Sequence, residues 1–216
     1  MSGQGRGRFI TLEGGEGGGK STQARRLAAA LEQIGLEVVL TREPGGSPGA
    51  EQIRALLVDG EVHRWDAVTE ALLHFAARRD HLQRTVLPTL ERGAWVVSDR
   101  FVDSTVAYQG YGRGLDLAAI DALTRMTVGP TTPDLTLILD LPVEAGLTRA
   151  GGRGTGEDRY ERMGHAFHQR IRDGFLEIAR KDPRRCVVID ASPDEDAVHA
   201  AVLEAVRARL GIEVAQ

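Results

Sequence analysis

A glycine-rich segment at residues 14–21, GGEGGGKS, constrains the fold of this chain more than any other feature. It fits the phosphate-loop pattern of a glycine, four residues, Gly-Lys and a hydroxyl residue. It also follows a short apolar run and precedes a segment whose apolar residues have helical spacing. A glycine loop between a buried strand and a helix lets backbone N–H groups and the helix N-terminus surround a phosphate. The segment therefore predicts an α/β fold that begins with a strand, a phosphate-binding loop and a helix.

Residues of this loop have expected roles in binding ATP and Mg²⁺. Lys20 is expected to reach the β- and γ-phosphates, and the Ser21 hydroxyl to bind Mg²⁺. Asp99 and Asp140 end two later apolar runs and are candidates to assist the metal, although for Asp140 an ordinary strand-end or helix-capping acid is the favoured interpretation. The expected nucleotide-binding residues of the loop are Gly14, Gly15, Glu16, Gly17, Gly18, Gly19, Lys20, Ser21 and Thr22.

Five short apolar runs alternate with longer segments of helical periodicity, which is typical of βαβ units and a parallel sheet. The predicted strands are Phe9–Glu13, Val38–Arg42, Trp95–Asp99, Leu135–Asp140 and Cys186–Asp190. The predicted helices are Ser21–Ile34, Ala67–Arg92, Leu117–Thr127, Glu157–Lys181 and Asp194–Leu210. Asp116 and Ser192, the latter before a proline, are the expected helix caps. Ligands of open α/β sheets bind beyond the carboxyl ends of the strands, so the polar residues that end these runs should share one rim.

Composition limits the class of protein. The chain has 216 residues, of which 42% are hydrophobic and 27% charged, and this favours one soluble domain over residues 1–216. No apolar run approaches the roughly 20 residues of a membrane span, and the first eight residues lack the apolar core of a secretion signal. We therefore expect a cytoplasmic protein without a membrane partner. The net charge of -4 also predicts small ligands and no nucleic-acid partner.

Arginines are expected to bind a second anion beside the first. Arg42 and Arg100 follow the second and third predicted strands, so both should reach the same rim. A glycine- and arginine-rich segment at about residues 150–157 predicts a mobile lid. Arg153 stands there between two glycines, whose conformational freedom would let the loop fold over the phosphates. Arg149 is expected on the preceding helix, near the donor nucleotide.

Six segments together resemble the bacterial thymidylate kinases: Glu13–Gly17, Thr41–Gly46, Phe75–Arg78, Asp99–Arg100, Ser104–Gln109 and Asp158–Glu161. Their order and spacing are similar to the family's over nearly the whole chain. The resemblance implies a P-loop NTPase fold of the nucleoside monophosphate kinase type, with helices around a five-stranded parallel sheet, and a homodimer. It also implies a kinase that transfers the γ-phosphoryl group of ATP to dTMP with Mg²⁺, giving dTDP for dTTP synthesis.

The same resemblance implies roles for individual residues. Arg78 and Gln109 would read the thymine, Arg42 and Arg100 would hold the acceptor phosphate, and Tyr108 would disfavour a ribose 2′-OH. The full set of expected dTMP-binding residues is Glu16, Arg42, Pro44, His74, Phe75, Arg78, Arg100, Ser104, Tyr108 and Gln109.

Catalysis is expected to depend on four side chains, Lys20, Arg153, Asp99 and Arg100. By the resemblance, Asp99 matches the family's acidic residue near the metal, and Glu16 would meet the sugar hydroxyl. Gly17 occupies the position where the eukaryotic form carries a catalytic arginine, so the chain resembles the bacterial type, whose arginine comes from the lid.

One position departs from the family. His74 stands four residues before Arg78, where the family commonly has a phenylalanine against the thymine face. The neighbouring Phe75 points about 100° away on a helix and does not simply replace it. Either His74 stacks on the base or the pocket of this chain differs.

Two other functions stay open on the residues alone. A P-loop kinase for another small acceptor, such as a different nucleoside monophosphate or a deoxynucleoside, would use the same loop and arginines. A nucleotide-dependent switch or partitioning ATPase would instead hydrolyse its nucleotide slowly and without an acceptor. The acceptor-side arginines and the glycine-arginine segment argue against this second class.

Overall fold

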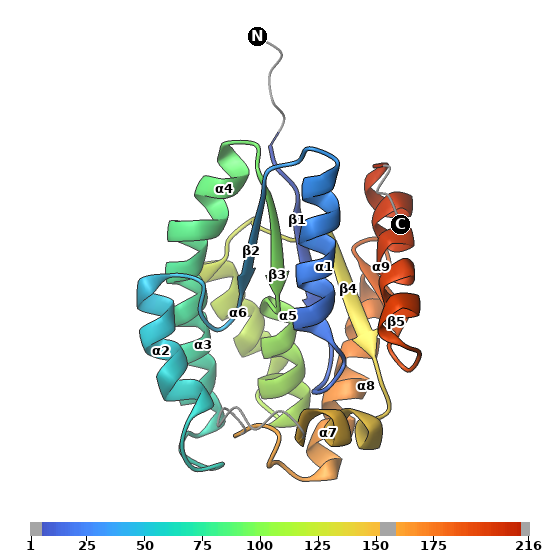
Figure 1. Ribbon diagram of the computed structural model, residues 1–216. Coiled ribbons are helices and arrows are strands. Elements are labelled where there is room, and N and C mark those ends of the chain that lie inside the picture. Colours follow the sequence, from blue (N-terminus) through green and yellow to red (C-terminus); the bar gives the residue numbers. More distant parts are fainter. Residues whose placement is uncertain (1–5, 152–158, 213–216) are drawn as a thin grey trace.

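The computed structural model describes residues 6–151 and 159–212, and a five-stranded parallel sheet runs through its centre (Figure 1). The strands are β1 Phe9–Glu13, β2 Val38–Arg42, β3 Trp95–Asp99, β4 Leu135–Asp140 and β5 Cys186–Asp190, with the bounds that were predicted. Their order is β2-β3-β1-β4-β5, and all of the paired strands are parallel. Because β1 is central, the loop that follows it lies at the middle of the sheet's carboxyl edge.

The helices surround this sheet on both faces. Their bounds are α1 Lys20–Gln33, α2 Pro48–Val58, α3 Ala67–His81, α4 Leu87–Glu91, α5 Val102–Thr105, α6 Leu117–Thr127, α7 Val143–Gly151, α8 His165–Lys181 and α9 Glu195–Leu210, with π-helical segments η1 Leu82–Val86 and η2 Val106–Gly112. In Figure 1 the carboxyl ends of the strands face the lower side of the view, where α7 lies. Within the described ranges, none of these helices has both the length and the apolarity that crossing a membrane requires.

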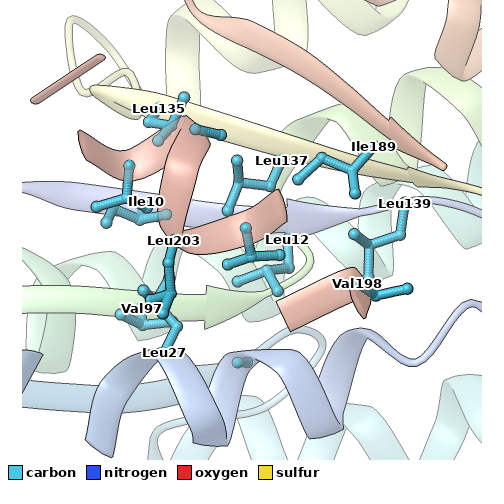
Figure 2. Close-up of a cluster of buried hydrophobic side chains, with 14 of the residues drawn as sticks. Ile10, Leu12, Leu27, Val97, Leu135, Leu137, Leu139, Ile189, Val198 and Leu203 are labelled. Atoms are coloured by element: carbon cyan, nitrogen blue, oxygen red, sulfur yellow. The ribbon is translucent and has the colours of Figure 1, made fainter. Parts of the chain in front are cut away.

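Alternate side chains of the strands point to opposite faces, and both faces are apolar, as parallel strands buried on two sides require. One face packs against α1 and α9; the cluster in Figure 2 includes Ile10, Leu12, Leu27, Val97, Leu135, Leu137, Leu139, Ile189, Val198 and Leu203. On the opposite face Phe9 and Val96 pack against η1, and Ile138 packs against α8. The central strands are therefore held rigidly between two helical layers, which fixes the residues at their carboxyl ends.

Several helix predictions were wrong in detail. The predicted helix Ala67–Arg92 is interrupted by η1, just before Pro88, which has no N–H to donate within a helix. The helix predicted from Glu157 begins at His165, because residues 159–163 form turns. Asp194 rather than Ser192 caps α9, since its carboxylate accepts the N–H of Ala197 while Ser192 belongs to a turn after β5. Asp116 caps α6 as predicted.

Candidate active site

Two joined cavities open at the carboxyl ends of the strands. The larger has a volume of about 920 Å³ and is lined by the phosphate loop and by residues that follow β2 and β3. The smaller, of about 140 Å³, is lined by residues of α3 and η2 and of the segment after β2. Glu16, Glu43 and Arg100 line both cavities. Adjoining cavities of this kind suit two ligands whose reacting ends must meet.

The phosphate loop shapes one wall of the larger cavity. Its lining residues are Glu16, Gly17, Gly19, Lys20, Ser21 and Thr22, whereas Gly14 and Gly15 line a small neighbouring cavity and Gly18 packs against Leu139. The Lys20 ammonium donates a hydrogen bond of 2.6 Å to the Gly15 carbonyl oxygen. Burial, followed by the charge of Arg100, lowers the pKa of Lys20 to about 8. Bound phosphates would raise this pKa again, because nearby anions favour an ammonium.

Ser21 and Asp99 lie together, as their proposed metal role requires. The Ser21 hydroxyl donates a short hydrogen bond to one Asp99 carboxylate oxygen, and the other oxygen, Oδ1, is buried without a partner among the described residues. Asp140 instead forms a two-bond ion pair with Arg172, at 2.7 and 2.9 Å. No group of three or more histidine, cysteine, aspartate or glutamate side chains suited to a metal occurs in the described part of the chain. The Ser21–Asp99 pair fits Mg²⁺, which is usually held by one or two protein oxygens together with phosphates and water.

Arg100 connects the phosphate loop to the smaller cavity. Its guanidinium donates to the Gly14 carbonyl oxygen at 3.2 Å, Ser104 Oγ at 3.1 Å, Glu16 Oε1 at 3.0 Å and Tyr108 Oη at 3.0 Å. Its φ of 74° is, within the described residues, the one positive value outside glycine. This left-handed conformation is costly for a side chain with a Cβ atom and typically occurs where function requires it.

A buried carboxylate, Glu13, supports the segment that carries Arg100. Glu13 Oε1 accepts the backbone N–H of Phe101 at 2.7 Å, and Oε2 accepts the hydroxyl of Ser104 at 2.5 Å. Burial, followed by the negative charge of Asp103, raises the pKa of Glu13 to about 8. The last residue of β1 therefore fixes the turn after the adjacent strand β3.

Arg42 is the last residue of β2, and Pro44 lies on the segment after it. The Arg42 guanidinium pairs with Glu51 at 3.1 Å and lines the larger cavity, whereas Pro44 lines the smaller one and its carbonyl oxygen accepts from Arg54 at 2.7 Å. Arg42 and Arg100 thus line the same cavity, as their places at the carboxyl ends of the second and third strands predicted.

His74 lies at the smaller cavity, against Tyr160. Its Nε2 atom is 3.0 Å from the Tyr160 hydroxyl, and the Tyr160 ring stands edge-on to Tyr108 with centroids 5.5 Å apart. Burial, followed by the charge of Arg78, lowers the pKa of His74 to about 3, so its imidazole is neutral near pH 7. The rings of His74, Tyr108 and Tyr160 therefore form one wall of the smaller cavity, and none of the three carries a charge near pH 7.

Arg78 and Gln109 each leave one buried polar atom unpaired among the described residues. Gln109 lines the smaller cavity, whereas Arg78 does not line it but bonds to Glu43 and Thr105, which do. Arg78 donates to Glu43 at 2.7 Å, to the Phe101 carbonyl oxygen at 3.0 Å and to Thr105 at 3.1 Å, but Nη1 has no partner among the described residues. Gln109 lines the cavity, and its Oε1 atom is likewise buried and unpaired. Buried polar atoms are normally hydrogen-bonded, so an unpaired donor and an unpaired acceptor indicate a missing ligand.

Phe75 and Arg149 lie elsewhere than at the two cavities, and Arg153 lies outside the described residues. Phe75 is buried in the core, with the Arg78 guanidinium 5.1 Å from the centre of its ring. Arg149 donates to the carbonyl oxygens of Ala191 and Ser192, at 3.0 and 3.1 Å, and so joins α7 to the segment after β5.

Sequence reasoning missed the buried acids that hold these side chains. Glu43 bridges Arg78 and His81 at 2.7 and 2.9 Å, and although burial alone would raise the pKa of Glu43, these two partners hold it below its usual value. Glu70 accepts from Gln109 at 2.8 Å. Glu70, His74 and Arg78 follow one another at intervals of four along α3, and this spacing, which places them on one helical face, was the available signal.

The phosphate loop also touches α7 through two glycines. A Cβ atom at Gly17 would lie 2.0 Å from the Gly146 carbonyl oxygen, and a Cβ atom at Gly146 would lie 2.5 Å from the Glu16 carbonyl oxygen. Gly17 also has a φ of 71°, which an L-residue with a side chain rarely adopts. Neither Gly17 nor Gly146 can carry a side chain unless α7 and the phosphate loop move apart.

Comparisons with known proteins agree with this geometry. A profile of the thymidylate kinase family matches residues 12–202. A thymidylate kinase of Caulobacter vibrioides is 59% identical over 204 residues, covering 94% of this chain and 98% of the relative. One of Bradyrhizobium sp. strain BTAi1 is 54% identical over 215 residues, covering 99% and 95%. The crystal structure of thymidylate kinase from Ehrlichia chaffeensis superimposes with a TM-score of 0.77 at 38% identity, covering 94% of this chain and 99% of that one. The chain therefore belongs to the thymidylate kinase family, enzymes that phosphorylate dTMP to dTDP with ATP.

Proposed function

We propose that this chain transfers the γ-phosphoryl group of ATP to dTMP across the junction of the two cavities. ATP occupies the larger cavity, with its phosphates in the loop around Lys20, and the dTMP base occupies the smaller one. The observation that carries this arrangement is that Glu16 and Arg100 line both cavities, so the reacting groups of the two ligands meet beside them. We place the protein in the cytoplasm, as one domain that includes the segment near residues 150–157.

Transfer under this proposal depends on position and charge. The phosphate of dTMP is already an anion at neutral pH, so no general base is required. Lys20, Arg42 and Arg100 would offset the charge of the two phosphate groups while the loop holds them in line. Ser21 and Asp99 would hold Mg²⁺, and the unpaired Asp99 oxygen supports this assignment. The metal would neutralise charge on the transferring phosphates.

The smaller cavity suits the edge of thymine. The O4 atom of thymine is an acceptor and would meet the unpaired Arg78 Nη1. The N3–H of thymine is a donor and would meet the unpaired Gln109 Oε1. We assign His74 to the face of the base, because it lines the cavity one turn before Arg78. Tyr108 and Glu16, joined by a hydrogen bond of 2.6 Å, would face the sugar.

A second copy of the chain is the proposed protein partner. Helices α3 and α6 pack side by side, and both carry exposed apolar side chains. Val68 and Leu72 lie one turn apart on α3, and Met126 lies on α6. Exposed apolar groups on neighbouring helices support a homodimer that buries them.

A panel of monophosphates tests the base assignment. With ATP and Mg²⁺, we expect kcat/KM for dTMP to exceed that for dCMP and dGMP by at least about a hundredfold, because a mismatched base leaves buried donors and acceptors unpaired. The value for dUMP should be the next highest, since loss of one methyl group weakens only an apolar contact of about 1–3 kcal/mol. Similar kcat/KM values across the panel would reject the assignment, and hydrolysis of ATP without an acceptor measures the background.

The contact between Gly146 and the phosphate loop yields a second test. Gly146→Ala should lower kcat for dTMP by about a hundredfold, because its Cβ would meet the Glu16 carbonyl oxygen and force the loop and α7 apart, and displacements near 1 Å can cost that much. Gly164→Ala is the matched control, since Gly164 precedes α8 and its Cβ would meet nothing within 4 Å. Equal kcat in the two variants, measured at steady state on folded protein, would show that the contact does not position the loop.

A further inference from the structure

A fully buried carboxylate lies behind the smaller cavity. The Glu70 side chain has 0% exposure and comes from α3, and two arginines share it. Arg113 Nε is 3.1 Å from Glu70 Oε1, and Arg159 makes a short contact to Oε2. This carboxylate also accepts from the Gln109 side-chain amide, whose Nε2 atom lies 2.8 Å from Oε1, and from the Tyr160 hydroxyl.

This contact fixes which end of the Gln109 amide meets the ligand. A carboxylate between two guanidinium groups accepts hydrogen bonds and has none to donate, so it must face the NH₂ end of the amide. The oxygen end, Oε1, then points away from Glu70, and it is the buried atom that lacks a partner. An amide that is held in this way presents only an acceptor to the smaller cavity, although a free glutamine can turn over and present either end.

The orientation of the amide separates bases that have similar shapes. Thymine offers N3–H, a donor, where cytosine has an unprotonated N3, an acceptor. An outward Oε1 therefore pairs with thymine and repels cytosine, whereas an outward NH₂ group would do the reverse. Shape alone separates the two rings poorly, because both are pyrimidines of nearly equal size.

We propose that Glu70 is a specificity-determining positioning residue, which holds the Gln109 amide in one orientation and thereby excludes cytosine nucleotides from the acceptor site. The inference rests on the proposed function, in which the smaller cavity holds the acceptor base. Glu70 does not line that cavity, and under this proposal it selects the base through Gln109.

The arginines around Glu70 make a conservative substitution feasible. Arg159 also donates to the carbonyl oxygens of Leu57, Glu61 and Val62, at 2.9, 3.1 and 3.2 Å. Arg113 also donates to the carbonyl oxygens of Trp65 and Val62, both at 3.2 Å. Both guanidinium groups therefore keep acceptors when the carboxylate becomes an amide of the same shape.

The test compares dTMP and dCMP as acceptors with ATP and Mg²⁺. In Glu70→Gln the new amide can donate to Gln109 Oε1, so the Gln109 amide is free to turn. We expect the ratio of kcat/KM for dTMP to that for dCMP to fall at least about tenfold, part of the preference surviving through Arg78. An unchanged ratio, even with a lower overall rate, would overturn the proposal, because a purely structural role for Glu70 would affect both acceptors alike.

A charge-conserving exchange supplies the matched variant. In Glu70→Gln/Gln109→Glu, the amide at position 70 donates to the carboxylate at position 109, whose outward oxygen can only accept. In this double variant the ratio of kcat/KM for dTMP to that for dCMP should return towards the wild-type value. A ratio no higher than that of Glu70→Gln would overturn the proposal. If Glu70→Gln does not fold, the double variant alone tests the proposal. A preference for dTMP near the wild-type ratio would support it, and loss of that preference would overturn it. The wild-type ratio is measured first, because an absent preference there would reject the base assignment itself rather than the role of Glu70.

Discussion

Replacing Lys20 by alanine or by arginine is expected to lower kcat for dTMP phosphorylation by about 10³-fold in both variants. Lys20 is 7% exposed, and its ammonium lies 2.6 Å from the Gly15 carbonyl oxygen of the phosphate loop. Alanine removes the cation that faces the transferring phosphate. Arginine keeps a positive charge, but its planar guanidinium is larger and cannot occupy the place of a compact ammonium.

The chain offers a matched control for this substitution. Its one other lysine, Lys181, lies at the end of α8 with most of its side chain exposed and pairs with Glu177 at 3.4 Å. Lys181→Arg should keep kcat within about twofold, because surface ion pairs contribute little. Steady-state kinetics at saturating ATP and dTMP decide the matter. A Lys20→Arg enzyme with more than a tenth of the wild-type kcat would show that charge alone suffices at this position.

Arg153→Ala should also lower kcat by about 10³-fold, with a much smaller effect on the KM for ATP. Charge that develops between donor and acceptor needs a nearby cation, and Gly17 occupies the position where the eukaryotic form of the family carries arginine. The contact of Gly17 with the Gly146 carbonyl oxygen leaves no space for a side chain there. The cation must therefore come from another segment, and Arg153 follows α7 by two residues.

Arg149 provides the comparison for Arg153. Its guanidinium donates to the carbonyl oxygens of Ala191 and Ser192 and lines neither cavity, so Arg149→Ala should lower kcat much less than Arg153→Ala does. The two variants are measured in parallel at saturating substrates. An unchanged kcat in Arg153→Ala, together with a large loss in Arg149→Ala, would move the catalytic role to the earlier arginine.

Strands β1, β3 and β4 were predictable because each is a short apolar run with a polar last residue, and burial on both faces leaves few other interpretations. The edge strands β2 and β5 are apolar runs of the same kind, although Leu40 and Val188 on them are exposed. The helices were less predictable where local and tertiary preferences disagree. In α7, Gly146 and Gly151 favour a loop by propensity, but contact with the phosphate loop requires the small residue at position 146. Helix α2 was missing from the prediction, although Ser47 and Pro48 are good starting residues for it.

The candidate site was predictable where a motif carries its own chemistry, as at Lys20 and Ser21. It was not predictable at Glu70, because nothing in its local sequence indicates that Arg113 and Arg159 will surround it. Contacts between residues so far apart in the chain follow from how the helices pack and not from a local pattern. Phe75 shows the same limit, since its position in the motif suggested the base pocket and its ring lies in the core.

The Gly17–Gly146 contact also constrains how such an enzyme can evolve. An arginine at position 17 requires α7 to move away from the phosphate loop before the new cation can contribute. That movement displaces the helix that leads to Arg153. If Arg153 supplies the cation as expected, a change at position 17 alone would disturb this arginine while it adds another. Ancestral sequences that cross between the two placements of the arginine should carry changes at positions 17 and 146 together.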